Sequence, residues 1–313
     1  VYANANVGTG IGVTANLIAD SFTAGPGTLL ANYQLPIGSV SGIVGTITPR
    51  PLTVAIIGNI AKVYDGAVSA NVGPGNLSVS GLVPGQTIVV SPSAASFAQS
   101  NVGTGILVSM PLSPASAFAI PGTLLSNYQL PSLATGSVGA ITPRPLQASL
   151  VGQASRPYDG TTVIALADAN IALTGLVAGE VITASTAVGT LASANVGTGL
   201  LVSAQLSPGN FTTAGGTAAT NYSFPELATG LIGTVLPRQL TASLVGTAEK
   251  VFNGNTQAAL AAANFALGGL VAGETITISP TTGIYASANA GNNILVTAAL
   301  GLDRFAAGPG TLL

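Results

Sequence analysis

The side chains that usually carry out chemistry are scarce in this chain of 313 residues, which has no His and no Cys. Without imidazole or thiolate, His- or Cys-ligated metal sites and Ser-His or Cys-His nucleophile–base pairs are excluded. Seven basic and nine acidic residues give a net charge of -2. This balance provides no basic footprint for nucleic acid. We therefore expect no enzyme, no catalytic residue and no cofactor within this chain.

An adjacent phenol and carboxylate form the most site-like group. Tyr64-Asp65-Gly66 and Tyr158-Asp159-Gly160 could contact a sugar or transfer a proton. The third occurrence, Phe252-Asn253-Gly254, keeps the shape but loses both ionisable groups. We therefore expect a core aromatic residue followed by a turn Asp that accepts backbone N–H bonds. The dipeptide Asp65-Gly66 suits a type I′ turn.

Other candidate sites are weaker. Lys62 and Lys250 could crosslink to Asn, but Arg156 holds the same position in the unit between them and cannot do that chemistry. Calcium needs clustered carboxylates, and the nine acidic residues lie at least nine positions apart in sequence. We expect no metal loop, although a calcium site gathered from distant strands at a domain junction stays open. The glycine string 103–105 lacks the features of a phosphate loop and is expected to be a turn or bulge.

The aromatic residues recur in columns, which favours core packing over a stacking platform for polysaccharide. Three tyrosines, each in Asn-Tyr-x-(Leu/Phe)-Pro, are expected to be corner residues with the hydroxyl bonded to backbone; they are Tyr33, Tyr128 and Tyr222. The four columns are Tyr64/Tyr158/Phe252, Tyr33/Tyr128/Tyr222, Tyr2/Phe97/Tyr285 and Phe22/Phe118/Phe211/Phe305.

A period of 94 residues organises the whole chain. The pentapeptides that end at Arg50, Arg144 and Arg238 recur at this spacing, as do the Tyr-Asp-Gly motifs. We expect each of these arginines to donate to carbonyl groups across a domain junction. The period divides the chain into a partial repeat, two full repeats and a second partial repeat; their bounds are 1–50, 51–144, 145–238 and 239–313. Because the chain starts and stops inside a unit, we expect it to be a window from a longer array.

One unit contains about seven or eight short β-branched segments, with turn signals roughly every 8–12 residues. Helical periodicity is nearly absent, and residues 258–263 are the one ambiguous stretch. The sequence predicts an all-β fold: a tandem array of β-sandwich-like domains joined by very short Pro-containing junctions. Pro49 and Pro51 restrict the backbone there, so the array should be stiff. No apolar run is long enough to span a membrane.

The ordered motifs carry a resemblance. Lys-Val-Tyr-Asp-Gly, Gly-Leu-Val-x-Gly, Asn-Val-Gly-Thr-Gly, Asn-Tyr and Ile-Thr-Pro-Arg-Pro-Leu together resemble the YDG-type repeat domains. Those domains occur in filamentous-haemagglutinin-like exoproteins of Gram-negative bacteria. The resemblance covers essentially the whole chain and implies an exported surface protein, commonly sent through two-partner secretion, with adhesive or matrix roles. Two features depart from the pattern: the Phe252-Asn253-Gly254 variant, and the stretch 114–125, which looks long and suggests an exposed loop.

These observations predict a structural segment of a long extracellular adhesin or fibre protein at a Gram-negative cell surface. Its array would be a stiff stalk or would form filaments in adhesion or biofilm matrix. The expected partners are neighbouring copies, through exposed edge strands, and host or matrix polysaccharide. One alternative is a carbohydrate- or receptor-binding module, with aromatic residues on one exposed face of every unit. Another is the accessory region of an enzyme whose catalytic domain lies elsewhere.

Overall fold

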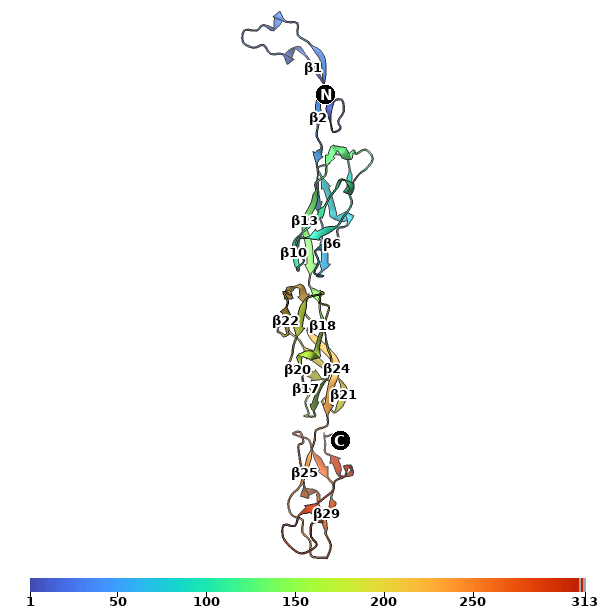
Figure 1. Cartoon of the computed structure of the whole chain (residues 1–313), viewed down its shortest axis with the longest axis vertical. Helices are drawn as coiled ribbons and strands as arrows, with labels where there is room; N and C mark the ends of the chain where they lie inside the picture. Colours follow the sequence, from blue (N-terminus) through green and yellow to red (C-terminus); the bar gives the residue numbers. More distant parts are fainter. Residues whose placement is uncertain (310, 312–313) are drawn as a thin grey trace. The chain divides into compact units, whose positions relative to one another are not determined.

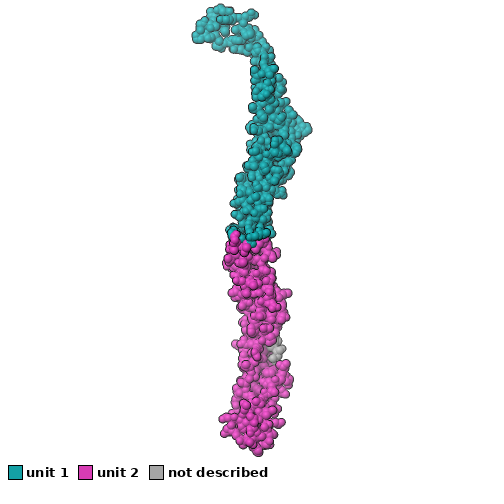
Figure 2. Space-filling model, in the orientation of Figure 1, with its two compact units in different colours: residues 1–145, 177–180, 216–223 teal, residues 146–176, 181–215, 224–313 magenta. Residues whose placement is uncertain are grey.

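The computed structural model describes residues 1–309 and residue 311, which divide into two compact units (Figure 2). Unit 1 comprises residues 1–145, 177–180 and 216–223, and unit 2 comprises 146–176, 181–215 and 224–313. The chain end at 310 and 312–313, which the period assigns to the second partial repeat, lies outside the described residues. By this division, two short segments of repeat 145–238, residues 177–180 and 216–223, belong to unit 1 together with the residues that precede that repeat.

Strands dominate both units, which confirms the predicted all-β class (Figure 1). In the described part of the chain, every helix is a three-residue 3-10 turn. The ambiguous stretch 258–263 contains the end of β26 (Gln257–Leu260) and the start of η9 (Ala262–Asn264). The other 3-10 turns are η1 (Ala19–Ser21), η2 (Leu30–Asn32), η3 (Pro74–Asn76), η4 (Pro114–Ser116), η5 (Leu125–Asn127), η6 (Asp168–Asn170), η7 (Pro208–Asn210), η8 (Ala219–Asn221) and η10 (Leu302–Arg304).

In unit 1, repeat 51–144 forms a seven-stranded sheet in the order β6-β9-β10-β13-β4-β7, with β5 also paired to β13. β13 is antiparallel to β10 and parallel to both β4 and β5. A separate antiparallel pair, β8–β11, packs its Ile88 and Ala117 against Leu52. The strands are β4 (Thr53–Ile56), β5 (Ile60–Val63), β6 (Ser69–Ala70), β7 (Leu77–Ser80), β8 (Ile88–Val90), β9 (Ala95–Phe97), β10 (Gly103–Pro111), β11 (Ala117–Ala119) and β13 (Leu133–Thr142).

In unit 2, residues of repeat 145–238 form the same sheet in the order β17-β20-β21-β24-β15-β18, with β16 paired to β24. The antiparallel pair β19–β22 corresponds to β8–β11. The strands are β15 (Gln147–Leu150), β16 (Ala154–Pro157), β17 (Val163–Ala165), β18 (Ile171–Thr174), β19 (Val181–Ala184), β20 (Val188–Leu191), β21 (Gly197–Gln205), β22 (Phe211–Ala214) and β24 (Leu227–Leu236).

The partial repeats carry fewer paired strands. In unit 1, β1 and β2 form an antiparallel hairpin, and the short parallel pairs β3–β12 and β14–β23 include the Pro-containing junction residues. In unit 2, the last repeat forms the pairs β25–β27 and β28–β31 and the three-stranded sheet β26-β29-β30. These strands are β1 (Gly8–Leu17), β2 (Gly38–Ile47), β3 (Arg50–Pro51), β12 (Tyr128–Gln129), β14 (Arg144–Pro145), β23 (Tyr222–Ser223), β25 (Thr241–Leu244), β27 (Phe265–Gly268), β28 (Ile276–Ile278), β29 (Thr281–Tyr285), β30 (Val296–Thr297) and β31 (Phe305–Ala307).

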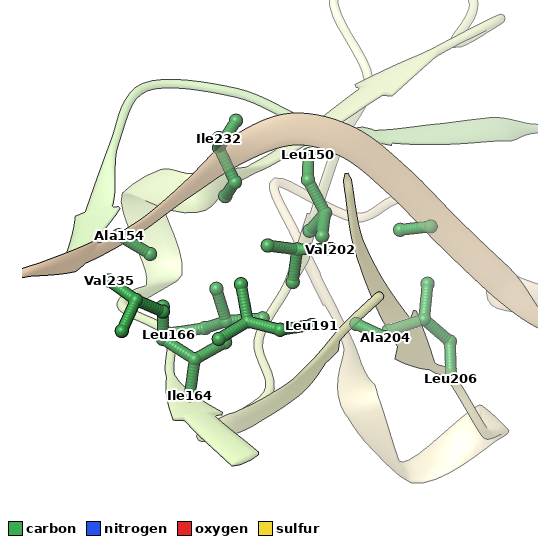
Figure 3. Close-up of a cluster of buried hydrophobic side chains, with 11 residues drawn as sticks. Leu150, Ala154, Ile164, Leu166, Leu191, Val202, Ala204, Leu206, Ile232 and Val235 are labelled. Carbon is green, nitrogen blue, oxygen red and sulfur yellow. The ribbon is translucent and has the colours of Figure 1, made fainter. Parts of the chain in front are cut away.

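The hydrophobic core of repeat 145–238 is mainly aliphatic, as Figure 3 shows. Val202 and Ala228 are fully buried, and Tyr158 and Phe211 pack at the margin of the cluster. Alternation along β21 and β24 turns these apolar side chains toward one side of the sheet. The cluster comprises Leu150, Ala154, Ile164, Leu166, Leu191, Val202, Ala204, Leu206, Ala228, Ile232 and Val235.

The aromatic columns only partly match the core. Phe118 is 58% exposed, and the position that it was predicted to fill in its column is held by the buried Ala117. Successive residues of a strand face opposite sides, so Phe118, one position after the buried Ala117, points to solvent. The strand register shows the true equivalents: Ala117 pairs with Val90, Phe211 with Ala184 and Phe305 with Ile278. The buried rings are Tyr64, Phe97, Tyr128, Tyr222 and Tyr285, and the exposed rings are Tyr2, Tyr33, Phe118 and Phe252.

The stretch 114–125 is mostly exposed, and it has the same length as its equivalent in the next repeat: η4, β11 and η5 recur as η7, β22 and η8 at a spacing of 94 residues. One local prediction is wrong. Asp65-Gly66 is not a type I′ turn, because Gly66 has φ +78° whereas Asp65 is not among the residues with positive φ. The Asp65 side chain closes this turn instead, and β5 pairs in parallel with β13 rather than forming a hairpin with β6.

In repeat 145–238, the central strand β24 has room only for glycine at position 230, where it lies against β15. A methyl group at Gly230 would lie 2.2 Å from Leu150 O, whereas one at Gly209, in η7, would meet nothing within 4 Å. We expect Gly230→Ala to lower the free energy of unfolding by about 3 kcal/mol, because the sheet must shift to admit the methyl group. Gly209→Ala is the matched control and should change it little. Urea unfolding monitored by circular dichroism measures both; equal losses would contradict the close approach.

Candidate functional site: the junction between repeats

The Tyr of the Tyr-Asp-Gly motif reaches a carboxylate in the following repeat. Tyr64 Oη donates to Glu180 Oε1 within unit 1, and Tyr158 Oη donates to Glu274 Oε1 within unit 2. Each acceptor lies 116 residues further along the chain, directly after the second glycine of the Gly-Leu-Val-Ala-Gly string. The motif therefore contributes to a contact between consecutive repeats.

The parallel pairing of β5 with β13 delivers Tyr64 to this position. Its backbone N–H donates to Thr142 O at 2.9 Å, continuing the ladder one residue beyond the strand. Tyr158 N–H donates in the same way to Leu236 O at 2.8 Å. Both tyrosines are thus held at the end of the central strand of their own repeat.

A second phenol shares the carboxylate of Glu180. Tyr222 Oη donates to Glu180 Oε2 and accepts a bond from Val177 N–H at 3.0 Å. The rings of Tyr64 and Tyr222 meet edge to face, with centroids 5.5 Å apart and planes at 78°. All four residues belong to unit 1. One carboxylate therefore joins a tyrosine of repeat 51–144 to a tyrosine of the next repeat.

The equivalent group in repeat 51–144 is simpler. Tyr128 Oη accepts a bond from Val83 N–H at 3.1 Å and donates to Gln86 Oε1 at 2.5 Å. Tyr128 and Tyr222 thus both bond to backbone, which confirms for them the corner role predicted from the Asn-Tyr motif. Gln86 occupies the position of Glu180 and Glu274, and its bond from Tyr128 stays inside one repeat.

The carboxylates alter the acidity of the phenols. The hydrogen bond to Glu180, together with burial, raises the pKa of Tyr64 to about 12. The bond to Glu274 likewise raises the pKa of Tyr158, and burial followed by the bond to Glu180 raises the pKa of Tyr222. These hydroxyls therefore stay protonated and act as donors near neutral pH.

The Asp of the motif serves its own turn. Asp65 Oδ1 accepts from Ala67 N–H at 2.9 Å and from Lys62 Nζ at 2.6 Å, and the bond from Lys62 lowers the pKa of Asp65. Asp159 repeats the arrangement with Thr161 and Arg156, and its bonds from Thr161 lower its pKa to about 2.

The Asn of the third motif can replace the Asp because the turn uses one side-chain oxygen. Asn253 Oδ1 accepts from Asn255 N–H at 3.3 Å and from Lys250 Nζ at 3.1 Å. The basic column, which holds Lys62, Arg156 and Lys250, thus has a structural partner in each of the three repeats that contain it.

The Gly of the motif leaves room for a neighbour. Gly66 and Gly160 have φ of +78° and +79°, in the region that favours glycine. A methyl group on either would lie 3.0 Å from a valine of the next repeat, Val177 or Val271. Gly254 has the same backbone geometry, with φ +74°, but nothing within 4 Å.

The junction arginines contact backbone carbonyls. Arg50 Nε donates to Gly81 O at 2.5 Å, and Arg238 Nε donates to Gly269 O at 2.5 Å. Arg238 Nη1 also reaches Tyr158 O at 3.5 Å, so it contacts the repeats on both sides. Arg144 lies in β14, which pairs with β23, and its side chain is half-buried.

An asparagine pair completes the junction, and sequence reasoning missed it. Asn221 accepts from Val102 N–H at 2.9 Å and donates to Asn101 Oδ1 at 3.0 Å, while remaining 1% exposed. Asn127 makes the same two bonds to Val7 N–H and Asn6 at 2.9 Å. The sequence does contain a signal for this pair, because the Asn-Val-Gly-Thr-Gly and Asn-Tyr strings recur with a fixed separation. Each string alone, however, predicts only a turn. Glu180 and Glu274 were missed for the same reason.

The arrangement is suited to holding two repeats together. Within the described residues, no three acidic side chains gather where they could hold a metal ion. In that same part of the chain, no helix is long and apolar enough to cross a membrane. The twelve landmarks predicted from the sequence divide accordingly. Those that contact the neighbouring repeat are Tyr64, Gly66, Tyr158, Gly160, Arg50 and Arg238. Asp65, Asp159 and Asn253 close their own turns. Arg144 lies in β14, and Phe252 and Gly254 are exposed.

The alkaline titration of Tyr64 tests the shared carboxylate. The pKa of Tyr64 is raised above its ordinary value of 10.0, so the stability that its protonated form contributes is present below pH 10 and is lost as the pH rises toward 12. We expect Glu180→Gln to move this titration back toward pH 10, as measured by ultraviolet absorbance of phenolate. Glu226→Gln, at an exposed site, is the control. Superimposable curves for the wild type and Glu180→Gln would exclude the contact.

Gly66 and Gly254 form a matched pair for testing the contact with Val177. Alanine at either position suffers the same strain at positive φ, of about 1 kcal/mol. Gly66→Ala also pushes its methyl group against Val177. We therefore expect Gly66→Ala to lower the thermal midpoint clearly more than Gly254→Ala does, in calorimetry of the whole chain. Equal shifts would mean that the valine contact contributes nothing.

Comparison with known proteins supports the repeat assignment. The family model described as YDG domain matches residues 48–135, 142–229 and 236–307, so successive matches begin 94 residues apart. No curated protein and no solved structure matches the chain. The three matched segments cover well over half of the chain and contain every Tyr-Asp-Gly motif and its Phe-Asn-Gly variant. The chain therefore belongs to the YDG domain family, as three tandem copies.

Proposed function

We propose that this chain is a structural segment of a long extracellular bacterial adhesin or fibre protein, in which tandem YDG repeats form a stiff stalk. The observation that carries the proposal is the use of the motif itself. Its tyrosine hydroxyl and its glycine face the next repeat at both Tyr64 and Tyr158, and its Asp closes the turn that presents them. A motif used in this way serves assembly along the chain.

Composition supports an exported protein. A chain without Cys needs no oxidation to fold after crossing an outer membrane. The resemblance to filamentous-haemagglutinin-like exoproteins supports two-partner secretion to a Gram-negative cell surface, with a role in adhesion or biofilm matrix. The chemistry of the junction consists of hydrogen bonds among uncharged groups, single carboxylates and single arginines, and this supports a structural rather than an enzymatic role.

Neighbouring copies are the partners that the proposal favours, since the net charge of -2 gives little mutual repulsion. The edge strands of the sheets argue against strong lateral association. β6 has two residues and β17 has three, and short edge strands are one way in which sheets limit edge-to-edge pairing. Lateral association through edge strands is therefore expected to be weak, and contacts along the chain carry more of the assembly.

The runner-up is a carbohydrate- or receptor-binding module. It needs exposed aromatic rings, and Phe118 provides one, beside the 47% exposed Val89. The equivalent residues of the next repeat are Thr212 and Thr183, so the feature is not repeated. Phe118 is the only exposed ring in the described residues of the two full repeats. This observation favours at most one such site and weakens a module that binds through every repeat.

Distance measurements between spin labels test the stiffness. The chain has no Cys, so Ser80→Cys and Thr174→Cys, at equivalent exposed positions 94 residues apart, label it selectively. We expect the distance distribution to be nearly as narrow as that of a control pair within one repeat, Ser80→Cys with Thr135→Cys. The bonds from Tyr64 and Asn221 should restrict the junction to one geometry.

A broad distribution, typical of a flexible linker, would overturn the stiff stalk. Antibody labelling of thin sections of source cells, viewed by electron microscopy, tests the location of the full-length protein. We expect label on surface filaments, and label confined to the cell interior would refute the extracellular role.

A further inference from the structure

We propose that the Tyr-Asp-Gly turn of each repeat is a preformed template that orders two segments of the repeat after it. In unit 1, these receiving segments are residues 177–180 and 216–223. The proposal rests on the structural role proposed above and adds a direction to it: each repeat stabilises the one that follows it along the chain.

The template is fixed within its own repeat. Four consecutive residues of β5 pair with β13, and Tyr64 N–H extends that pairing to Thr142. Asp65 accepts from Ala67 N–H, and Lys62 Nζ donates to Ala67 O at 2.6 Å. All these partners lie in repeat 51–144, so the turn can form without the repeat that follows.

The receiving segments are held differently. Residues 177–180 contain no strand, and β23 has only two residues, which pair with β14 at the repeat boundary. Tyr222 joins the two segments by its bonds to Val177 N–H and Glu180. By their contacts, both segments group with the residues before repeat 145–238 rather than with that repeat's own sheet.

The template contacts both receiving segments at once. The Tyr64 hydroxyl donates to Glu180, its ring lies against Tyr222, and the absence of a side chain at Gly66 admits Val177. Hydrogen bonds to a charged group in a partly buried site are among the stronger ones. Loss of the Tyr64 hydroxyl would leave the carboxylate of Glu180 with one of its two phenol donors.

Unit 2 repeats the arrangement one period later. Tyr158 donates to Glu274, and Gly160 lies under Val271. The template there is again internal to its repeat, since β16 pairs with β24 and Thr161 N–H donates to Asp159. The contacts of the tyrosine hydroxyl and of the glycine with the first receiving segment therefore recur at both Tyr-Asp-Gly motifs.

The proposed direction, from each repeat to the one after it, follows because the template and the receiving segments differ in local stability. A coupling free energy is reciprocal, so the contact itself favours neither side. A loop opens locally at low cost, whereas a turn that directly continues β5, a strand paired with β13 of the seven-stranded sheet, opens at a higher cost. Weakening the contact should therefore appear as faster opening of the receiving segments, while the template opens as before.

Hydrogen–deuterium exchange of the whole 313-residue chain, read by mass spectrometry, tests this inference. We expect Tyr64→Phe, which keeps the ring, to speed exchange about tenfold or more in residues 176–182 and 216–223. Exchange in residues 52–67 should stay unchanged. Glu180→Gln, which weakens the same contact from the other side, should also leave residues 52–67 unchanged.

The matched control is Tyr128→Phe, which removes the hydroxyl of an equivalent corner tyrosine whose acceptor, Gln86, lies in its own repeat. Its effect should be confined to residues 82–87 and 123–129. Equal acceleration in residues 52–67 and in the receiving segments after Tyr64→Phe would overturn the direction. No acceleration anywhere would overturn the template itself. A narrow spin-label distribution in that case would leave the stiff stalk standing, so the two proposals fail separately.

Discussion

The parallel pairing of β5 with β13, and of β16 with β24, is the constraint on which the junctions depend. A parallel partner makes two strand ends leave the sheet at the same edge, so the Tyr-Asp-Gly turn and the Pro-containing exit from the repeat emerge together. This brings together Tyr158 and Arg238, which lie 80 residues apart in sequence: Arg238 Nη1 donates to Tyr158 O at 3.5 Å. The central strand thus serves as the reference to which both junction elements are fixed.

The junction uses few charges, and it uses each of them locally. Every Asp or Glu at this surface accepts from a phenol, a backbone N–H or a single cation, and no acidic cluster forms among the described residues. Buried polar groups are stabilising only when they are paired, and Asn221, at 1% exposure, satisfies both ends of its amide. A chain with 5% charged residues can therefore still specify how one repeat meets the next.

The sequence was sufficient for the fold class and the period, because both are written in recurring local patterns. It was insufficient for the junction partners. Tyr64 and Glu180 are separated by 116 residues, and a lone Glu after a Gly-rich turn has no local signature. The position of Phe118 was misjudged for a different reason: sequence columns tolerate a one-residue slip, whereas a strand reverses the side-chain direction at every residue. Only the register, with Ala117 opposite Val90, distinguishes the two alignments.

The turn at Asn253-Gly254 has a chemical consequence for the ageing of the protein. Asn followed by Gly is a dipeptide in which the next backbone nitrogen readily attacks the side-chain amide and releases ammonia, and water then opens the resulting succinimide to aspartate or isoaspartate. The aspartate product would be the residue that the other two turns already carry, at Asp65 and Asp159. It would keep the single acceptor oxygen that the turn uses and would give Lys250 a carboxylate partner. Spontaneous deamidation to aspartate at this site would therefore give the variant turn the Asp-Gly dipeptide of its neighbours, while Phe252 would remain in place of their tyrosine.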